Sequence, residues 1–204
     1  MTHTAQKAIV KVQHYKYRQM RKVILTVAVS LDSFIEGPNK EVDWMTFDEE
    51  TGTELNNFLQ EIDTVLYGRV SYELYGNYTP SDSSGDFEKD FYHKLNKLTK
   101  YVFSSSKVEF SGNPKVVKSD IVQIIQNLKQ QPGKNIWLYG GAGLISNFMN
   151  LNLIDEIRLA VIPIILGGGT PLFKGIKERV KLKLLKTVTS KSGVVGLSYA
   201  TFID

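Results

Sequence analysis

The sequence predicts one α/β domain with a mainly parallel central sheet that is covered by helices on both faces. Apolar, β-branched runs alternate along the chain with longer amphipathic stretches, which is the pattern of βαβ units. The C-terminal part instead carries two β-rich runs around a short polar turn, which predicts an antiparallel hairpin at one edge of the sheet. The length of 204 residues, 42% of them hydrophobic, is that of one globular domain with a sizeable core.

Strands are expected where short runs are rich in Val, Ile, Leu and aromatic residues. They span Val23 to Val29, Thr64 to Tyr67, Tyr101 to Phe103, Lys115 to Val117, Ile136 to Tyr139 and Glu156 to Ile165. Helices are expected over the amphipathic stretches Asp48 to Gln60, Ser71 to Tyr75, Phe87 to Leu98, Asp120 to Lys129 and Leu144 to Asn150. The hairpin strands are Lys181 to Thr189 and Val194 to Phe202.

The charge distribution divides the chain into a basic leader, residues 1–21, and a single domain, residues 22–204. Residues 1–22 contain several Lys and Arg and no acidic side chain, so the rest of the chain is slightly acidic although the whole carries +4. The folded part is therefore not expected to bind nucleic acid. A binder of nucleic acid through the leader remains a low-ranked alternative.

Several classes of site are excluded by residue usage. The chain has no Cys, which excludes disulfides, zinc–thiolate sites and cysteine nucleophiles. Of three His, two lie in the leader, so a metal site is not expected. No apolar run is long enough to cross a bilayer, and the leader lacks the apolar segment of a secretory signal. We expect a cytoplasmic protein without a membrane partner.

One glycine-rich segment joins a buried strand directly to a helix. Ile136 to Tyr139 is followed by Gly140-Gly141-Ala142-Gly143 and then by Leu144. Glycines allow the backbone to approach a phosphate, and a helix N-terminus presents free N–H groups to it. Ser146 stands where the Rossmann fingerprint has a third Gly or an Ala, so the segment is not a good match to it. The segment predicts an anion-binding turn of another fold, or a tight turn without a ligand.

A second strand ends in a similar way. Leu66-Tyr67-Gly68 leads into Arg69, Val70 and Ser71, which adds a guanidinium and a hydroxyl at the turn. Arginine supplies a planar set of donors that suits phosphate. Ser104 and Ser105 follow a third strand. Together these turns are typical of a cradle for dinucleotide phosphates.

In this order and spacing, the motifs resemble the dihydrofolate reductase superfamily. They are Gly68-Arg69-x-Ser71-Tyr72-Glu73, Val102 to Ser105 and Tyr139 to Gly143. The segments Asp155 to Leu159 and Pro163 to Phe173 favour the branch of the RibD C-terminal reductase domain. The resemblance covers about residues 22–202. It implies a three-layer αβα fold with a sheet of about eight strands, a homodimer and NADPH as cofactor.

The resemblance also implies roles for individual residues. Arg69 and Ser105 would contact the adenosine 2′-phosphate, with Gly68 and Ser104 in the same turns. Ala28 and Ile35 would form the wall beside the nicotinamide. The pyrophosphate would be held by Ser71 and by Gly140, Gly141, Ala142, Gly143 and Leu144.

Two aspartates are candidates for the catalytic proton source. Hydride transfer needs a proton donor near the acceptor, often a carboxylic acid. Asp32 follows the first strand, and Ser33 stands where the family pattern has Gly. Asp48 follows Trp44, the candidate substrate contact, one residue closer than in the folate enzymes. A loop cap for Asp32 and an ordinary helix N-terminal acid for Asp48 are the structural alternatives.

The expected activity is NADPH-dependent reduction of a pyrimidine or pterin compound. The nearest reaction implied by the resemblance reduces 5-amino-6-(5-phosphoribosylamino)uracil in riboflavin biosynthesis. Dihydrofolate reductase is an alternative, although Asp43 precedes Trp44 where the folate enzymes have Pro. A nucleotide-binding protein without turnover is another, because fold alone does not decide function.

Overall fold

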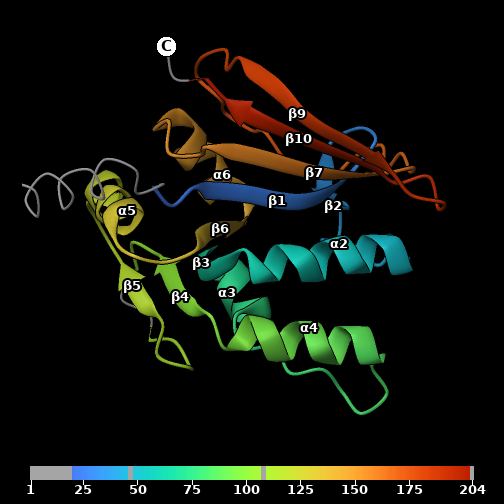
Figure 1. The fold of residues 1–204 in the computed structure, drawn as a ribbon, viewed down its shortest axis with the longest axis horizontal. Helices are drawn as coiled ribbons and strands as arrows, with labels where there is room; N and C mark the ends of the chain where they lie inside the picture. The colour runs from blue at the N-terminus through green and yellow to red at the C-terminus, as the bar shows by residue number, and fades with distance from the viewer. Residues whose placement is uncertain (1–19, 46–47, 107–108, 203–204) are drawn as a thin grey trace, which may run out of the picture.

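The computed structural model describes residues 20–45, 48–106 and 109–202. The predicted leader falls almost entirely on residues 1–19, which lie outside the described residues. Within the described part, the predicted α/β class, the mainly parallel sheet and the C-terminal hairpin are confirmed (Figure 1).

The central sheet has eight strands in the order β5-β4-β3-β6-β1-β7-β10-β9. All neighbours from β5 to β7 are parallel, and the last two pairs are antiparallel. The strands are β1 (Val23–Ser30), β3 (Ile62–Gly68), β4 (Thr99–Phe103), β5 (Lys115–Val117), β6 (Asn135–Gly140), β7 (Glu156–Ile162), β9 (Leu182–Thr189) and β10 (Val195–Thr201). The parallel strands are buried and apolar because helices cover both faces.

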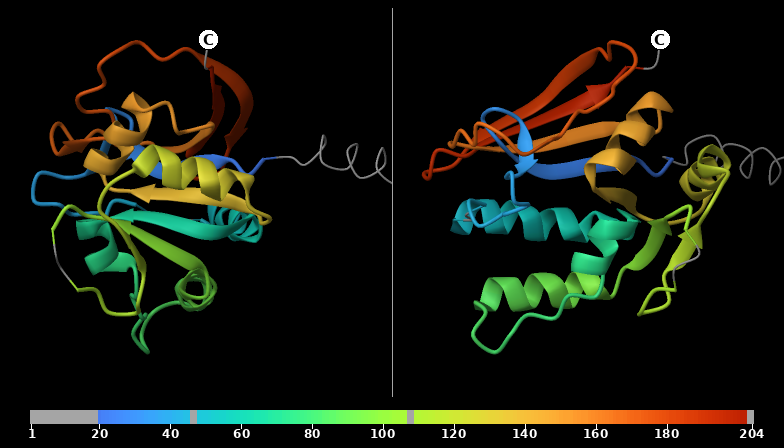
Figure 2. Two further views of the ribbon diagram at one scale, coloured as in Figure 1. Left: turned by 90° about the vertical axis from the view of Figure 1, so that its left-hand side faces the viewer. Right: turned by 180° about the vertical axis from the view of Figure 1, so that it is seen from behind.

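Among the described residues, five helices form the outer layers. They are α2 (Glu49–Gln60), α3 (Arg69–Tyr75), α4 (Asp86–Asn96), α5 (Ile121–Gln130) and α6 (Ala142–Asn150). On one face, α2 and α4 pack around Phe58, Leu95 and Trp137. On the other, α5 and α6 pack around Ile125 and Phe148. Figures 1 and 2 show α2 and α4 side by side along one face of the twisted sheet.

A second, two-stranded sheet was not predicted from the sequence. It pairs β2 (Phe34–Glu36) with β8 (Thr170–Pro171) in antiparallel orientation. The predicted strand that began at Glu156 ends at Ile162 rather than Ile165, because the chain then turns towards this small sheet. Gly169 makes the turn possible: its φ is 132°, and a Cβ there would collide with the carbonyl oxygen of Glu36.

The tip of the C-terminal hairpin is held against the start of helix α2. This tip, Ser190 to Gly193, joins β9 to β10. The Ser192 hydroxyl donates to Asp48 Oδ2 at 2.6 Å, and the Lys191 N–H donates to Glu50 Oε2 at 3.1 Å. These contacts bridge the start of α2 and the far edge of the sheet. In the part of the chain that the structure describes, no helix is long and apolar enough to span a membrane.

Arg21, assigned to the leader by the sequence prediction, is buried at the start of the domain, with 6% of its surface exposed. Its guanidinium forms an ion pair with Asp63 and donates to Thr64 Oγ1 at 2.7 Å. It also donates to the carbonyl oxygens of Leu128 and Lys134. Arg21 thereby ties the starts of β1 and β3 to the end of α5.

We predict that Arg21→Ala lowers the free energy of unfolding by about 3 kcal/mol, because it leaves Asp63 and two carbonyls without their buried partner. Lys22→Ala is the matched control: Lys22 is half exposed and pairs with Glu156 at 3.2 Å. Its loss should cost about 1 kcal/mol or less. Urea unfolding measures both values, and equal effects would contradict the role given to Arg21.

Candidate functional site

The two glycine turns singled out in the sequence lie against each other. They follow β3 and β6, which are parallel neighbours in the sheet, with Leu66 beside Leu138. A Cβ on Gly68 would lie 3.4 Å from the Gly141 nitrogen. The peptide bond between Gly140 and Gly141 is cis, and Gly140 has a φ of 116°. The backbones of the two turns thus lie close together, and both turns open at one edge of the sheet because β3 and β6 are parallel.

A large cleft begins at this edge. Its volume is about 1710 Å³, larger than the roughly 300 to 1,000 Å³ typical of a pocket for one small ligand. Gly68, Ser71 and the segment Gly141 to Leu144 line it, whereas Gly140 lies buried behind them. No side chain caps the N-terminus of α6, which follows Gly141. The residues predicted for the pyrophosphate cradle therefore border a backbone-lined opening with a helix N-terminus beside it.

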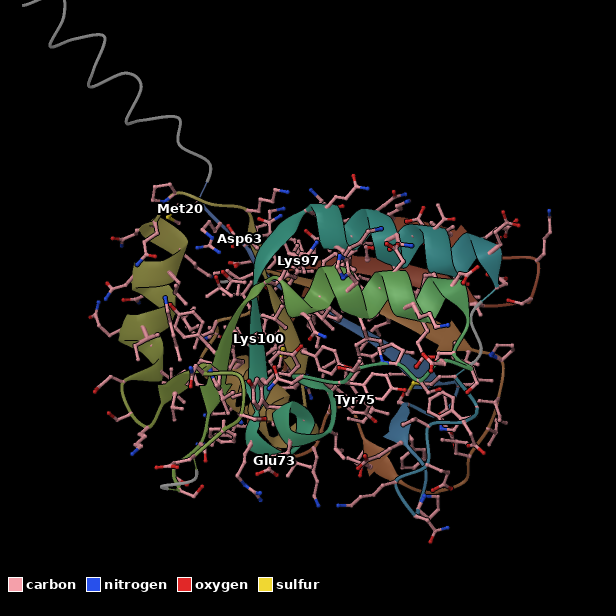
Figure 3. The ribbon with its side chains drawn as sticks, turned by 90° about the horizontal axis from the view of Figure 1, so that it is seen from below. Met20, Asp63, Glu73, Tyr75, Lys97 and Lys100 are labelled. Atoms are coloured by element: carbon pink, nitrogen blue, oxygen red, sulfur yellow. The ribbon has the colours of Figure 1, made fainter. Side chains whose placement is uncertain are left out.

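The cation and hydroxyl groups predicted for the cradle also line the cleft. They are Arg69, Ser71, Ser104 and Ser105. Arg69 Nη1 pairs with Glu73 Oε2 at 2.8 Å, and both side chains are about half exposed. Figure 3 shows Glu73 on the outer side of α3. The Ser104 hydroxyl lies 2.9 Å from that of Ser106, while Ser105 is exposed. Arg69 can turn between Glu73 and an anion in the cleft.

Ala28 and Ile35, the predicted nicotinamide wall, line the cleft next to the cradle. Ala28 lies on β1, the central parallel strand, directly beside Ala160 on β7. Ile35 lies on β2, the small strand that the sequence did not predict. The β2–β8 pairing therefore positions one of the two wall residues.

Asp32 is not among the residues that line the cleft. Its carboxylate accepts the backbone N–H groups of Leu166, at 3.1 Å, and Gly167, at 2.8 Å. The Ser30 hydroxyl and these N–H groups hold the pKa of Asp32 below its usual value, against a smaller opposing effect of burial. Ser33 has a φ of 67°, in the left-handed region that favours the glycine of the family pattern. The geometry supports the loop-capping alternative for Asp32.

Asp48 is the N-cap of α2 and is not a lining residue of the cleft. It accepts hydrogen bonds from the Ser192 hydroxyl and from the hydroxyl and backbone N–H of Thr51, and these bonds lower its pKa. Trp44 also lies outside the lining, and its indole N–H donates to the Glu41 carbonyl. A carboxylate with a lowered pKa is a poor proton donor, so the geometry favours a structural role for Asp48.

The sequence did not identify most of the side chains beyond the cradle. Glu36 and Tyr75 face the cleft, and burial together with the charge of Glu36 raises the pKa of Tyr75. Figure 3 shows Tyr75 on the side of α3 that faces α4. The aromatic lining residues are Phe58, Tyr75, Phe87, Phe91, Tyr92, Phe103, Trp137 and Tyr139. They come from several helices and strands, so no local pattern marks them. Among the described residues, no group of His, Asp and Glu could hold a metal ion.

The chain matches a known protein family and a curated relative over most of its length. The family model of the RibD C-terminal domain matches residues 21–196. The uncharacterized protein YyaP of Bacillus subtilis is 45% identical over 181 residues, which are 89% of this chain and 95% of that protein. The curated relatives thus share almost the whole chain.

The fold is shared with many solved structures, among them the following two. One is a diaminohydroxyphosphoribosylaminopyrimidine deaminase/5-amino-6-(5-phosphoribosylamino)uracil reductase of Thermotoga maritima, 18% identical, with a TM-score of 0.66 over 93% of this chain and 59% of that one. The other is a dihydrofolate reductase of Enterococcus faecalis in complex with NADP(H), 16% identical, with a TM-score of 0.60 over 88% and 96% of the two chains. The predicted dihydrofolate reductase-like fold is confirmed.

We predict that Asp32→Asn lowers the thermal unfolding temperature at pH 7, because an amide has one acceptor oxygen for two backbone donors. The folded pKa of Asp32 is lowered, so its stabilisation is complete above the unfolded value of about 4 and is lost as the pH falls. The difference in unfolding temperature between Asp32→Asn and wild type should therefore narrow below about pH 4. Asp82→Asn, in an exposed loop, is the control and should unfold at the temperature of wild type. A difference for Asp32→Asn that stays constant with pH would contradict this account.

Proposed function

The chain belongs to the RibD C-terminal domain family, and on that premise we propose that it is an NADPH-dependent reductase of a pyrimidine or pterin compound. The observation that carries the proposal is the contact between the turns at Gly68 and Gly141, beside Arg69 and the nicotinamide wall. The nearest candidate reaction reduces 5-amino-6-(5-phosphoribosylamino)uracil. Dihydrofolate reduction is the second candidate, supported by the shared fold.

The residues present fit the phosphates of a dinucleotide. A Cβ on Gly141 would lie 3.1 Å from Ser71 Oγ, so the glycine leaves the hydroxyl open to the cleft. The free end of α6 offers backbone N–H groups and a partial positive charge to the pyrophosphate. Arg69 and Ser105 would contact a 2′-phosphate at the outer end of the cradle.

The bound cofactor would supply a hydride to the acceptor. The small side chain of Ala28 and the branched side chain of Ile35 would orient the nicotinamide, and closure by α2 would limit the entry of water. The Tyr75 phenol is protonated at neutral pH, as an ordinary tyrosine is, and burial raises its pKa further, so its hydroxyl can donate a hydrogen bond to the acceptor. For Asp32 and Asp48 we propose positioning roles, since they hold the 166–167 turn and the hairpin tip.

We also propose a homodimer. Strand β9 forms the edge of the sheet, and its described side chains are exposed. The exposed apolar residues on it are Leu182, Leu184, Leu185 and Val188. An exposed apolar edge strand is a surface that proteins commonly cover.

Leu184→Glu is expected to shift the chain from dimer to monomer in sedimentation velocity, because a charge would be buried in the interface. Lys183→Glu, on the same strand, is the control: it changes the charge without removing apolar surface, so it should retain more dimer than Leu184→Glu does. A monomeric wild-type chain at micromolar concentration would contradict the homodimer.

The cofactor is tested by calorimetric titration of the full chain with NADPH and NADH. We predict that Arg69→Ala weakens NADPH binding about tenfold and leaves NADH unchanged, because only NADPH carries the extra phosphate. Glu73→Gln should instead strengthen NADPH binding, since it removes the competing partner of Arg69.

Two glycine variants control this experiment. Gly141→Val should weaken the binding of both NADPH and NADH, because the side chain fills the pyrophosphate opening. Gly85→Ala should alter the binding of neither, because a Cβ at Gly85 meets nothing within 4 Å. Equal losses of NADPH and NADH in Arg69→Ala would overturn the assignment of the 2′-phosphate. Failure of the folded wild type to bind either cofactor would overturn the reductase.

A further inference from the structure

We propose that the substrate of this cleft is a flat, uncharged aromatic heterocycle that carries no phosphate group. The inference rests on the proposed function, which assigns the glycine turns to the cofactor. It concerns the rest of the cleft, which we call the substrate compartment. This part is lined by α2, α4 and the facing strands β6, β1, β7, β10 and β9.

The floor of the substrate compartment is flat because its central side chains are small. Ala28 on β1 lies beside Ala160 on β7, and Ala160 lies beside Gly196 on β10. All three line the cleft. Val188 on β9 continues the same row and lies beside Gly196. Three neighbouring strands thus expose little more than backbone and methyl groups, which a planar ring can cover closely.

The walls beside this floor are aromatic. The rings of Phe58 on α2 and Trp137 on β6 meet edge to face, with centroids 5.3 Å apart. Phe91 on α4 packs against Trp137, with centroids 6.4 Å apart, and Tyr139 does so at 4.9 Å. The Trp137 N–H is already bonded to the carbonyl oxygen of Thr26. Phe58, Phe91 and Trp137 are largely buried but line the cleft, so the surface that they leave to a heterocycle is aromatic.

Carboxylates dominate the charged groups of the compartment. We call them the acidic rim, and they are Glu36, Glu49, Glu50, Glu54 and Glu88. The basic residues that line the same part are Lys40, Arg158 and Lys186. Arg158 is held by Glu156 at 2.7 Å and Glu61 at 3.0 Å, and Lys186 faces Glu54 at 3.6 Å. Carboxylates therefore neutralise two of the three cations, and Lys191 in turn pairs with Glu50 at 3.5 Å. The rim still retains an excess of negative charge from Glu36, Glu49 and Glu88.

This charge balance separates the two ends of the cleft. A phosphate at the cradle meets Arg69 and the N-terminus of α6. A phosphate dianion in the substrate compartment would meet the acidic rim, and repulsion between like charges disfavours its binding. An uncharged ring avoids this cost. The compartment therefore favours a substrate without the phosphoribosyl group of the nearest candidate reaction.

One polar group in the floor is available to orient such a ring. Thr26 Oγ1 is buried and has no hydrogen-bond partner among the described residues. Thr26 lies beside Arg158 in the strand register and lines the cleft. A hydroxyl can donate to a ring nitrogen or accept from a ring N–H. A heterocycle would satisfy this group, which a purely apolar ligand leaves unbonded.

Riboflavin and its 5′-phosphate, FMN, are suitable probes because they share the ring and side chain and differ by one phosphate. Each is titrated by calorimetry into the full chain with saturating NADP⁺, which occupies the cradle and cannot transfer a hydride. We expect riboflavin to bind about tenfold more tightly than FMN at low salt. The difference should shrink when the salt is raised to about 0.5 M, because ions screen the rim.

The matched variants are Glu49→Gln/Glu54→Gln in the acidic rim and Glu178→Gln, an exposed acid outside the cleft. The rim variant should bind FMN about threefold more tightly with little change for riboflavin, and the control should match wild type. Thr26→Val should weaken the binding of riboflavin and FMN equally, because it removes the hydroxyl that would bond the ring they share.

Equal or tighter binding of FMN in wild type, or no binding of riboflavin, would overturn the inference while NADP⁺ binding still supports the reductase. Failure of NADP⁺ to bind would overturn the proposed function and the inference with it. An equal gain of FMN binding in Glu178→Gln would show that net charge, and not the rim, sets the preference.

Discussion

The parallel pairing of β6 with β3 on one side and β1 on the other is the constraint on which the rest of the structure depends. Parallel strands end at the same edge of a sheet, so the turns after β3 and β6 must open there together. Their backbones approach closely: a Cβ on Gly68 would lie 3.4 Å from the Gly141 nitrogen, and a Cβ on Gly141 would lie 3.1 Å from Ser71 Oγ. The same alignment brings Ala28 on β1 next to this opening. Cradle and wall are thus consequences of one pairing pattern.

The cleft combines two chemical environments on one sheet. Backbone groups, hydroxyls and Arg69 gather at the ends of β3, β4 and β6, which suits an anionic dinucleotide. Aromatic rings and carboxylates gather under α2 and α4. The antiparallel hairpin extends the floor under α2, and its tip is fastened to that helix through Asp48 and Glu50. This part of the cleft therefore lies between a floor of strands and the capped helix α2.

Much of the fold was accessible from the sequence because it depends on local patterns. Most predicted strands and helices agree with the structure to within about three residues, since period and apolar content decide them. The short strands β2 and β8 were missed, because their pairing depends on a contact between Glu36 and Gly169 that no local pattern encodes. Burial of Arg21 was missed for the same reason, since its partners are distant in the chain.

The sequence by itself determined the α/β class, the glycine turns and the family, because each rests on residue types at fixed short spacings. Only the tertiary structure decided what Asp32 and Asp48 do: their partners, the 166–167 turn and Ser192, are more than a hundred residues away. It also decided the character of the substrate compartment. The acidic rim and aromatic walls come from separate helices and strands, and their meeting depends on strand register and helix packing.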